Sequence, residues 1–254
     1  MSRQLPPGGS SASRLLQRLM QDTHCKTCGA PLAAGERYLC AKCAAESQRL
    51  NREAEERLAA HDRAERQRVL ESRLAMVPLD FRGVDFAAAA DRVTRPGAVD
   101  DACGVTPSTP MVSFTGESGS GKTTLAAAMF NAVLRSATDG GADRIGLAES
   151  AMWTSAVALA MDRRQHPMGA GESPLVAMAR ASSYLVIDDV GLEQHNFDAI
   201  AEVIYERQSN QRPTVLTLSL PADDLAARYG GGIVRRIGGA RAVVIRCDHT
   251  PQVD

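Results

Sequence analysis

Long hydrophobic runs are missing from this sequence of 254 residues. The longest apolar stretches, such as residues 125–134, reach about half of the ~18 residues that a membrane-spanning helix needs. Residues 1–13 are rich in Pro, Gly and Ser and lack the apolar segment of a secretory signal peptide. We therefore expect a cytoplasmic protein that contacts no membrane. Its length allows one mid-sized domain and a smaller element.

The sequence is also short of net charge and of lysine. It carries 29 Lys and Arg against 30 Asp and Glu, and the net charge of -1 excludes a strongly basic nucleic-acid coat for the whole chain. Only three basic residues are lysines, which an arginine-rich genome explains. Each of the three nevertheless lies within a motif, Lys26 and Lys42 between paired cysteines and Lys122 in a glycine-rich segment.

Cysteine is uncommon, but four of the six cysteines are clustered in two C-x-x-C pairs with eleven residues between the pairs. The four are Cys25, Cys28, Cys40 and Cys43. This spacing is typical of a structural Zn²⁺ site, and four thiolate ligands leave no open position for catalysis. We expect a zinc-binding module over residues 21–45, preceded by a flexible tail over residues 1–20. Cys103 and Cys247 stand alone and are interpreted as ordinary residues.

Residues 44–74 contain no Pro or Gly and are rich in Glu, Arg, Gln and Ala, which predicts one long helix. Its apolar positions, such as Leu50, Ala54 and Leu58, form only a thin stripe. Two interpretations stay open: a solvated spacer, or an arm that docks on a partner. We assign residues 46–76 to this helical linker or arm. Residues 1–74 carry 13 basic and 9 acidic side chains, so this part is slightly basic.

After Pro78 the pattern changes to short apolar strands that alternate with helices. The expected strands are 111–115, 144–148, 184–187, 214–218 and 242–245. The expected helices are 125–134, 151–164, 199–208 and 222–229. Residues 95–110 and 169–173 are expected to be loops. Such alternation predicts an α/β domain over residues 77–254, with a parallel sheet covered by helices on both faces.

One segment of this domain matches the phosphate-loop pattern G-x-x-x-x-G-K-[ST] between an expected strand and an expected helix. The candidate nucleotide-binding residues are Gly116, Glu117, Ser118, Gly119, Ser120, Gly121, Lys122, Thr123 and Thr124. Glycines let backbone N–H groups close around an anion at the start of a helix. Lys122 is expected to contact the β and γ phosphates of ATP, and the Thr123 hydroxyl is expected to bind Mg²⁺.

A second motif supports the first. The apolar strand expected over residues 184–187 leads directly into Asp188 and Asp189, as in a Walker B motif. Asp188 is expected to hold Mg²⁺, directly or through water. Asp189 is in position to orient or deprotonate the attacking water. Together the two motifs predict binding of a nucleoside triphosphate and its hydrolysis.

The order of motifs after residue 77 resembles the DnaC/IstB-like AAA+ ATPases, which include bacterial and phage helicase loaders. The matching segments are VPLDFRGVDF (77–86), the phosphate loop with LAAA (125–128), LVIDDVG (185–191), RPT (212–214) and a box with YG (229–230), Ile233 and RI (236–237). The resemblance covers about two thirds of the chain. It implies the AAA+ P-loop NTPase fold for the domain that follows the zinc module and the long helix.

The resemblance also implies roles for two further residues. Arg236 corresponds to the arginine finger, which acts on the nucleotide of a neighbouring subunit, so the active form would be a homo-oligomer with ATP at its interfaces. Ser219 stands where the family commonly has the sensor-1 asparagine. Asp189 stands where the wider superfamily usually has glutamate. Because both side chains are shorter, we expect slow hydrolysis.

The resemblance favours a loader of a DnaB-type replicative helicase onto single-stranded DNA. Two alternatives remain open: an IstB-like transposition helper ATPase, and a nearly inert adaptor switched by nucleotide. Direct DNA contact has little support, because the candidate arginines are not interleaved with aromatic residues and are interpreted as solvated charges. These arginines are Arg163, Arg164, Arg235 and Arg241. Trp153 is expected to be packed rather than stacked on a base.

Overall fold

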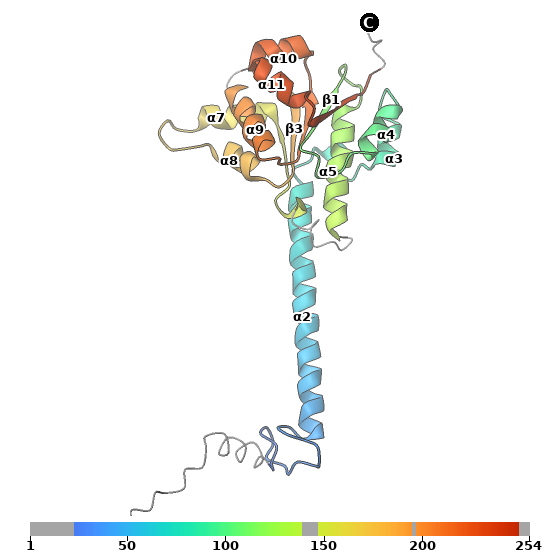
Figure 1. Cartoon of the computed structure of the whole chain (residues 1–254), viewed down its shortest axis with the longest axis vertical. Coiled ribbons are helices and arrows are strands. Elements are labelled where there is room, and N and C mark those ends of the chain that lie inside the picture. Colours follow the sequence, from blue (N-terminus) through green and yellow to red (C-terminus); the bar gives the residue numbers. More distant parts are fainter. Residues whose placement is uncertain (1–22, 139–146, 195–196, 249–254) are drawn as a thin grey trace, which may run out of the picture. The chain divides into compact units, whose positions relative to one another are not determined.

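A computed structural model describes residues 23–138, 147–194 and 197–248 (Figure 1). The tail expected over residues 1–20 lies outside these ranges. The chain divides into two compact units, with the boundary between Glu65 and Arg66. None of the helices within the described ranges combines the length and the apolar character that a membrane crossing requires.

The first unit is built on the two turns that carry the cysteine pairs. The Cys25 N–H donates to the Ala30 carbonyl at 2.7 Å and closes the first turn. The Glu36 carboxylate accepts from the Ala41 N–H at 2.6 Å. Ala41 is the first residue of helix α2 (Ala41–Leu74), so Glu36 satisfies one of the amide groups that have no partner within the helix.

Helix α2 confirms the helix expected over residues 44–74, and it continues across the boundary between the two units. None of its side chains is buried, and Leu50 and Leu58 are 52% and 64% exposed. In the second unit, Leu70 and Leu74 are partly buried against the domain core. The exposed stripe suits a spacer as well as a docking arm, so both interpretations remain.

The second unit contains a five-stranded sheet in which every pair is parallel, in the order β2-β3-β4-β1-β5. The strands are β1 (Met111–Thr115), β2 (Met152–Ser155), β3 (Leu185–Val190), β4 (Thr214–Leu218) and β5 (Ala242–Arg246). Strands β1, β3 and β4 lie inside the sheet and are buried over most of their length, which explains their nearly continuous apolar sequences.

Helices cover both faces of the sheet (Figure 1). One face carries α3 (Phe86–Ala90), α4 (Gly97–Cys103) and α5 (Lys122–Thr138). The other carries α7 (Ala156–Gln165), α8 (Pro174–Ala181), α9 (Phe197–Ser209), α10 (Ala222–Tyr229) and α11 (Gly231–Ile237). Alternate strand residues serve two cores, since Val186 and Val215 pack with α5 while Leu185 and Leu216 pack with α9. The expected α/β architecture is confirmed.

The strand expected over residues 144–148 is wrong. Residues 147–149 are helical, residues 144–146 lie outside the described ranges, and the strand is β2 instead. The helix expected over 151–164 therefore begins later, at Ala156. The Ser155 hydroxyl accepts from the Ala158 N–H at 3.1 Å and caps this helix, so the strand ends where the cap begins.

The loop expected over residues 95–110 is also partly wrong, because it contains helix α4. Ala98, Val99 and Ala102 are buried in the core on the α5 face, and this spacing places them on one side of a helix. Tertiary packing thus forms a helix within a stretch whose Pro, Gly and Asp content predicts a loop. Helix α8 was not expected either, and Pro174 occupies its first turn.

Helix α9 carries a fully buried guanidinium that anchors the amino ends of β3 and β4. Arg207 donates to the carbonyls of Ala179 (2.9 Å), Ser182 (2.6 Å) and Pro213 (2.6 Å) and to the Thr214 hydroxyl (2.9 Å). Burial is the main cause that lowers the Arg207 pKa to about 9, so the group remains charged at neutral pH. Its donors replace water at the end of α8 and before β4.

We expect the substitution Arg207→Met to lower the free energy of unfolding by about 3 kcal/mol, because several buried carbonyls lose their donor. For a unit of this size the loss corresponds to a melting temperature about 6–12 °C lower, measurable by calorimetry. Arg164→Met removes an exposed arginine of α7 and is the matched control, with an expected change within about 0.5 kcal/mol. Equal melting temperatures for the two variants would contradict the anchoring role.

Candidate functional site

The glycine-rich loop connects β1 to the amino end of α5, which is the context that a phosphate loop requires. Gly121 has a φ of 93°, and a Cβ at this position would lie 2.8 Å from the Arg92 carbonyl oxygen, so only glycine fits. The Lys122 ammonium donates to the carbonyls of Gly116 (2.7 Å) and Glu117 (2.8 Å). These two carbonyls hold the ammonium beside the loop.

The two acidic residues of β3 lie at an irregularity in the strand. Side chains of a regular strand alternate between faces, so Asp188 and Asp189 would point to opposite sides of the sheet. The pairing register instead shifts between Ile187 and Val190, and Asp189 has a φ of 57°. The bulge lets both carboxylates lie near Thr123, which Asp188 contacts and with which Asp189 lines a cavity.

Asp188 is the buried member of the pair. Its Oδ1 accepts from the Thr123 hydroxyl at 3.0 Å and from the Thr217 hydroxyl at 2.6 Å. Burial is the main cause that raises the pKa of Asp188, and the neighbouring Asp189 carboxylate raises it further. A cation beside Asp188 and Thr123 would offset both effects. The oxygen donors of these two residues therefore fit a Mg²⁺ ion.

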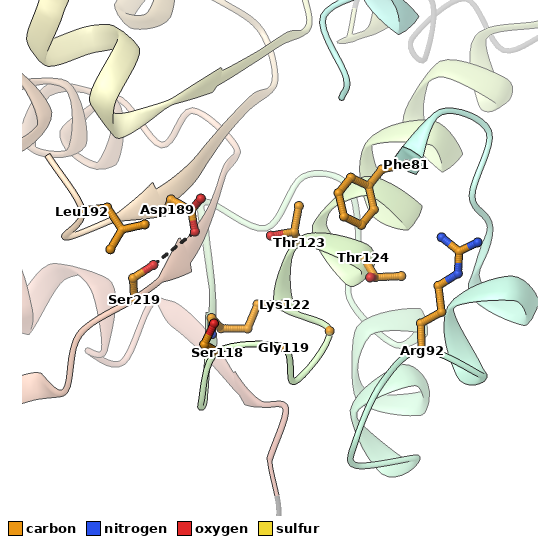
Figure 2. Close-up of a pocket in the computed structure, with 11 residues that line it drawn as sticks. Phe81, Arg92, Ser118, Gly119, Lys122, Thr123, Thr124, Asp189, Leu192 and Ser219 are labelled. Carbon is orange, nitrogen blue, oxygen red and sulfur yellow. Dashed lines mark hydrogen bonds between the residues drawn. The ribbon is translucent and has the colours of Figure 1, made fainter. Parts of the chain in front are cut away.

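A cavity of about 410 Å³ lies over the loop (Figure 2). Asp189, Leu192 and Ser219 lie on one side of Lys122, and Phe81 and Arg92 lie on the other side (Figure 2). The lining also includes the expected residues Ser118, Gly119, Gly121, Thr123 and Thr124. Gly116 and Glu117 line a second cavity beside the loop, and Ser118 and Ser219 line both cavities. The structure thus brings most of the expected phosphate-site residues together with Asp189 and Ser219.

Ser219 follows β4 and donates a hydrogen bond to the Asp189 Oδ1 at 3.2 Å (Figure 2). The sequence analysis missed Thr217, whose hydroxyl donates to Asp188 and accepts from the Asp189 N–H at 2.7 Å. Thr217 therefore fixes both acidic residues. A polar residue within the buried strand β4, on the face next to Asp188, is the signal that could have identified it.

Three more residues of the cavity were not predicted from the sequence, and one of them, Leu192, follows β3. Phe81 ends the short 3₁₀ helix η1 (Leu79–Phe81), and Arg92 follows α3. Phe81 lies in the segment that carries the family resemblance, but no pattern in the sequence distinguishes it as a lining residue. Arg92 also donates to the Asp80 carbonyl at 3.2 Å, which links the segment before the domain core to the cavity wall. An aromatic ring and a guanidinium there could contact a nucleobase.

Arg236, expected to act in trans, is not among the residues that line the cavity of its own chain. It lies on α11, with its guanidinium carbon 4.3 Å from the centre of the Tyr205 ring and with a hydrogen bond to the Gly232 carbonyl at 3.0 Å. The Tyr205 side chain is 54% exposed. The position suits contact with another molecule, and the role of Arg236 at a neighbouring subunit stays a prediction.

The other candidate arginines differ in their surroundings. Arg163 forms ion pairs with Glu172 at 2.8 Å and with Glu202 at 3.0 Å, so its charge is paired within the fold. Arg164, Arg235 and Arg241 are exposed. Trp153 is buried in β2 and packs edge-on against Phe130, with ring centres 5.8 Å apart, as expected for a core residue.

In the first unit, the sulfur atoms of Cys25, Cys28, Cys40 and Cys43 lie within 4.8 Å of one another. The Cys28 and Cys40 sulfurs are 3.7 Å apart. Zn–S bonds of about 2.3 Å in a tetrahedron place sulfur atoms about 3.8 Å apart, so the cluster fits zinc. The Lys26 ammonium lies 4.6 Å from the centre of the Tyr38 ring, and this contact keeps the lysine charge beside the cysteine cluster.

The thiols of this cluster differ in acidity. Backbone N–H groups of Cys40 and Cys28 lower the Cys25 pKa to about 6. The Cys43 pKa is raised, chiefly because its thiol donates to Cys28 and Cys40. A cation bound by the four sulfur atoms would favour their thiolate forms.

The chain matches no protein-family model, and a comparison with curated proteins finds no similar sequence. Among solved structures, it is similar to the crystal structure of the DnaC helicase loader, with a TM-score of 0.51 and 19% identity over 67% of this chain and 100% of that chain. Two further similarities have TM-scores below 0.5 and support no argument. One is the crystal structure of DnaI, with a TM-score of 0.44 and 19% identity, which covers 71% of this chain and 93% of that chain. The other is AMPPCP-bound DnaA from Aquifex aeolicus, with a TM-score of 0.39 and 22% identity, which covers 54% of this chain and 40% of that chain.

At 19% identity, the similarity to the DnaC helicase loader concerns the fold. The cluster of four cysteines lies outside the ATPase-like unit, in the part of the chain before Glu65. The chain therefore contains a domain that shares its fold with the DnaC helicase loader, preceded by a four-cysteine cluster that fits a zinc-binding module.

Proposed function

We propose that this protein is an ATP-dependent loader that binds a DnaB-type replicative helicase and helps to place it on single-stranded DNA. The observation that carries the proposal is the contact of Thr123 with Asp188 (3.0 Å) beside Lys122, within a fold shared with the DnaC helicase loader. This arrangement supports a triphosphate and its metal ion at one end of the sheet. The resemblance of the sequence motifs to helicase loaders supports the choice of partner.

The residues of the loop have separate tasks in this proposal. The N–H groups from Gly119 to Thr124 and the start of α5 attract the phosphates. Lys122 exchanges its two carbonyl acceptors for β- and γ-phosphate oxygens. Phe81 and Arg92 lie on the side of the cavity away from Asp189 and would contact the nucleoside (Figure 2).

Bound Mg²⁺ would neutralise charge on the phosphates between which the bond breaks. Thr123 and Asp188 would hold it, and Thr217 keeps Asp188 oriented. Asp189, with Ser219 bonded to its carboxylate, orients the attacking water and accepts its proton. Arg236 would stabilise the charge of the transferring phosphoryl group in a neighbouring subunit of a homo-oligomer.

The four cysteines would hold one structural Zn²⁺ ion in this protein, and the ion would stabilise the short segment around the two turns. A segment this small buries too little apolar surface to fold by itself. The module and helix α2 are then available for contact with the helicase, whereas nucleotide chemistry stays in the second unit.

We expect Lys122→Ala to weaken ATP binding at least ~10-fold and to abolish turnover, since the ammonium contacts the phosphates in both steps. Asp189→Asn should leave binding within about threefold of the wild type and reduce turnover about 100-fold. Titration of a fluorescent ATP analogue and phosphate release measure the two quantities. Lys42→Ala, which removes an exposed lysine near the cysteines, is the control. Wild-type affinity in the Lys122 variant would contradict the assignment.

We expect the purified protein to contain about one zinc ion per chain. Cys43→Ser should lose most of the zinc and increase hydrogen exchange over residues 23–43, because the fold of this segment depends on the metal. Cys103→Ser changes an exposed cysteine outside the cluster and should keep the full zinc content. Elemental analysis and exchange mass spectrometry supply the readouts. Far less than one ion in the wild type would refute the zinc site.

We expect the wild-type protein to form a stable complex with the DnaB-type helicase of its own source. It should also load this helicase onto single-stranded DNA coated with binding protein, so that the helicase then unwinds a fork. Lys122→Ala should still form the complex but should not load the helicase. Native mass spectrometry and a fork-unwinding assay measure these steps. Turnover stimulated by duplex DNA, with no helicase bound, would favour a transposition helper. Helicase binding with ATP but without turnover would favour a switched adaptor.

A further inference from the structure

The segment that follows the two acidic residues is tied to helix α10 by a group of side chains that the proposed chemistry does not use. Glu193 is 1% exposed, although a buried carboxylate is costly unless it is paired. Its Oε1 accepts a hydrogen bond from the Tyr229 hydroxyl, and its Oε2 accepts from the Gly191 N–H at 3.0 Å. The carboxylate therefore joins the turn after β3 to the last residue of α10.

Arg228 completes this connection. Its Nη1 donates to the carbonyls of Gly191 (2.6 Å) and Glu193 (2.5 Å) and lies 3.4 Å from the Glu193 carboxylate. Arg228 and Tyr229 of α10 thus bind the turn over residues 191–193, and the Glu193 side chain is one of their acceptors. We call Glu193, Arg228 and Tyr229 the α10 clamp.

The clamped turn leaves little freedom to the backbone around Asp189. Gly191 has a φ of 109°, and a Cβ there would lie 2.8 Å from the Leu220 side chain, so the turn is packed against the segment after β4. The Leu192 N–H donates to the Asp189 carbonyl at 3.2 Å. Leu192 also lines the cavity over the phosphate loop (Figure 2). A shift of the clamp would therefore reach both Asp189 and the cavity wall.

The connection from the α10 clamp to Asp189 matters because Asp189 has a left-handed backbone. An aspartate at a φ of 57° is strained relative to a regular strand and keeps that conformation only where its surroundings hold it. Thr217 and Ser219 hold it from β4, and the α10 clamp holds the turn on the other side. Helix α10 ends at Tyr229, and the single residue Gly230 connects it to α11, which carries Arg236.

We propose that Glu193, Arg228 and Tyr229 are positioning residues through which the helix pair α10–α11 sets the position of Asp189. This inference rests on the proposed ATPase function and deepens it. The same helix pair carries the residue expected to act on a neighbouring subunit, so a displacement of α11 at an interface is transmitted to the water-orienting carboxylate of its own site. The clamp couples neighbouring nucleotide sites through rigid contacts and leaves the phosphate loop unchanged.

The test is Tyr229→Phe, which removes one hydroxyl from the clamp. We expect kcat for ATP to fall about tenfold, because a small displacement of Asp189 misplaces the attacking water. The dissociation constant for ATP should stay within about twofold, because the phosphate loop is untouched. Tyr184→Phe is the matched control, since the Tyr184 hydroxyl is buried without a hydrogen-bond partner among the described residues. Its kcat should equal that of the wild type.

Two further variants separate positioning from general stability. Glu193→Gln keeps an acceptor for Tyr229 and should retain more turnover than Glu193→Ala at equal nucleotide affinity. In the Asp189→Asn background, Tyr229→Phe should cause no additional loss, because the clamp acts through Asp189. Equal kcat for Tyr229→Phe and Tyr184→Phe, or an additive loss in the double variant, would overturn the inference. A wild-type protein that neither binds nor hydrolyses ATP would instead refute the proposed function.

Discussion

The candidate site depends on one geometric constraint, which is that Asp188 bonds Thr123 while the next residue, Asp189, lines the cavity that Thr123 also lines. Regular alternation forbids this, because Asp188 and Asp189 would lie on opposite faces of β3. The bulge before Val190 and the left-handed backbone of Asp189 resolve the conflict. Thr217 then makes the solution stable, since one hydroxyl bonds the carboxylate of Asp188 and the N–H of Asp189. Strand β4 is therefore part of the site as well as part of the core.

The two ends of the sheet are held by different means. At the amino ends of β3 and β4, Arg207 binds several carbonyls from a fully buried position, and this end has few ways to move. At the carboxyl ends, the contacts are made by hydroxyls, carboxylates and one lysine whose partners a ligand can exchange. Because the amino ends of the strands are held rigidly, the strands stay in register while contacts around the phosphate loop are exchanged at the carboxyl ends.

The sequence predicts the parts of this structure that depend on local pattern. Strands β1, β3 and β4 have continuous apolar runs, and the sequence predicts them in kind and place. The phosphate loop and the paired cysteines have fixed spacings, and the structure brings the residues of each motif together. The errors have another origin. Helix α4 forms because Ala98, Val99 and Ala102 find a core to pack against, and β2 lies where the Ser155 cap ends it. Thr217 and the α10 clamp depend on partners about 30 residues away or more, and no local pattern reveals such contacts.

The shorter side chains of the site act together. Aspartate in place of glutamate at position 189 withdraws the carboxylate by one methylene, and serine in place of asparagine at position 219 shortens the reach of its partner. The two nevertheless remain in contact at 3.2 Å, so the pair is intact. Such a pair orients water less closely against a γ-phosphate, while Lys122 and Thr123 keep their full reach for binding. Under the proposed function, such a site would hold ATP firmly and hydrolyse it slowly, which would suit a loader whose ATP-bound state must last while a helicase assembles on DNA. Any signal that moves the bulge, including one that arrives through α10, then has a large effect on the rate.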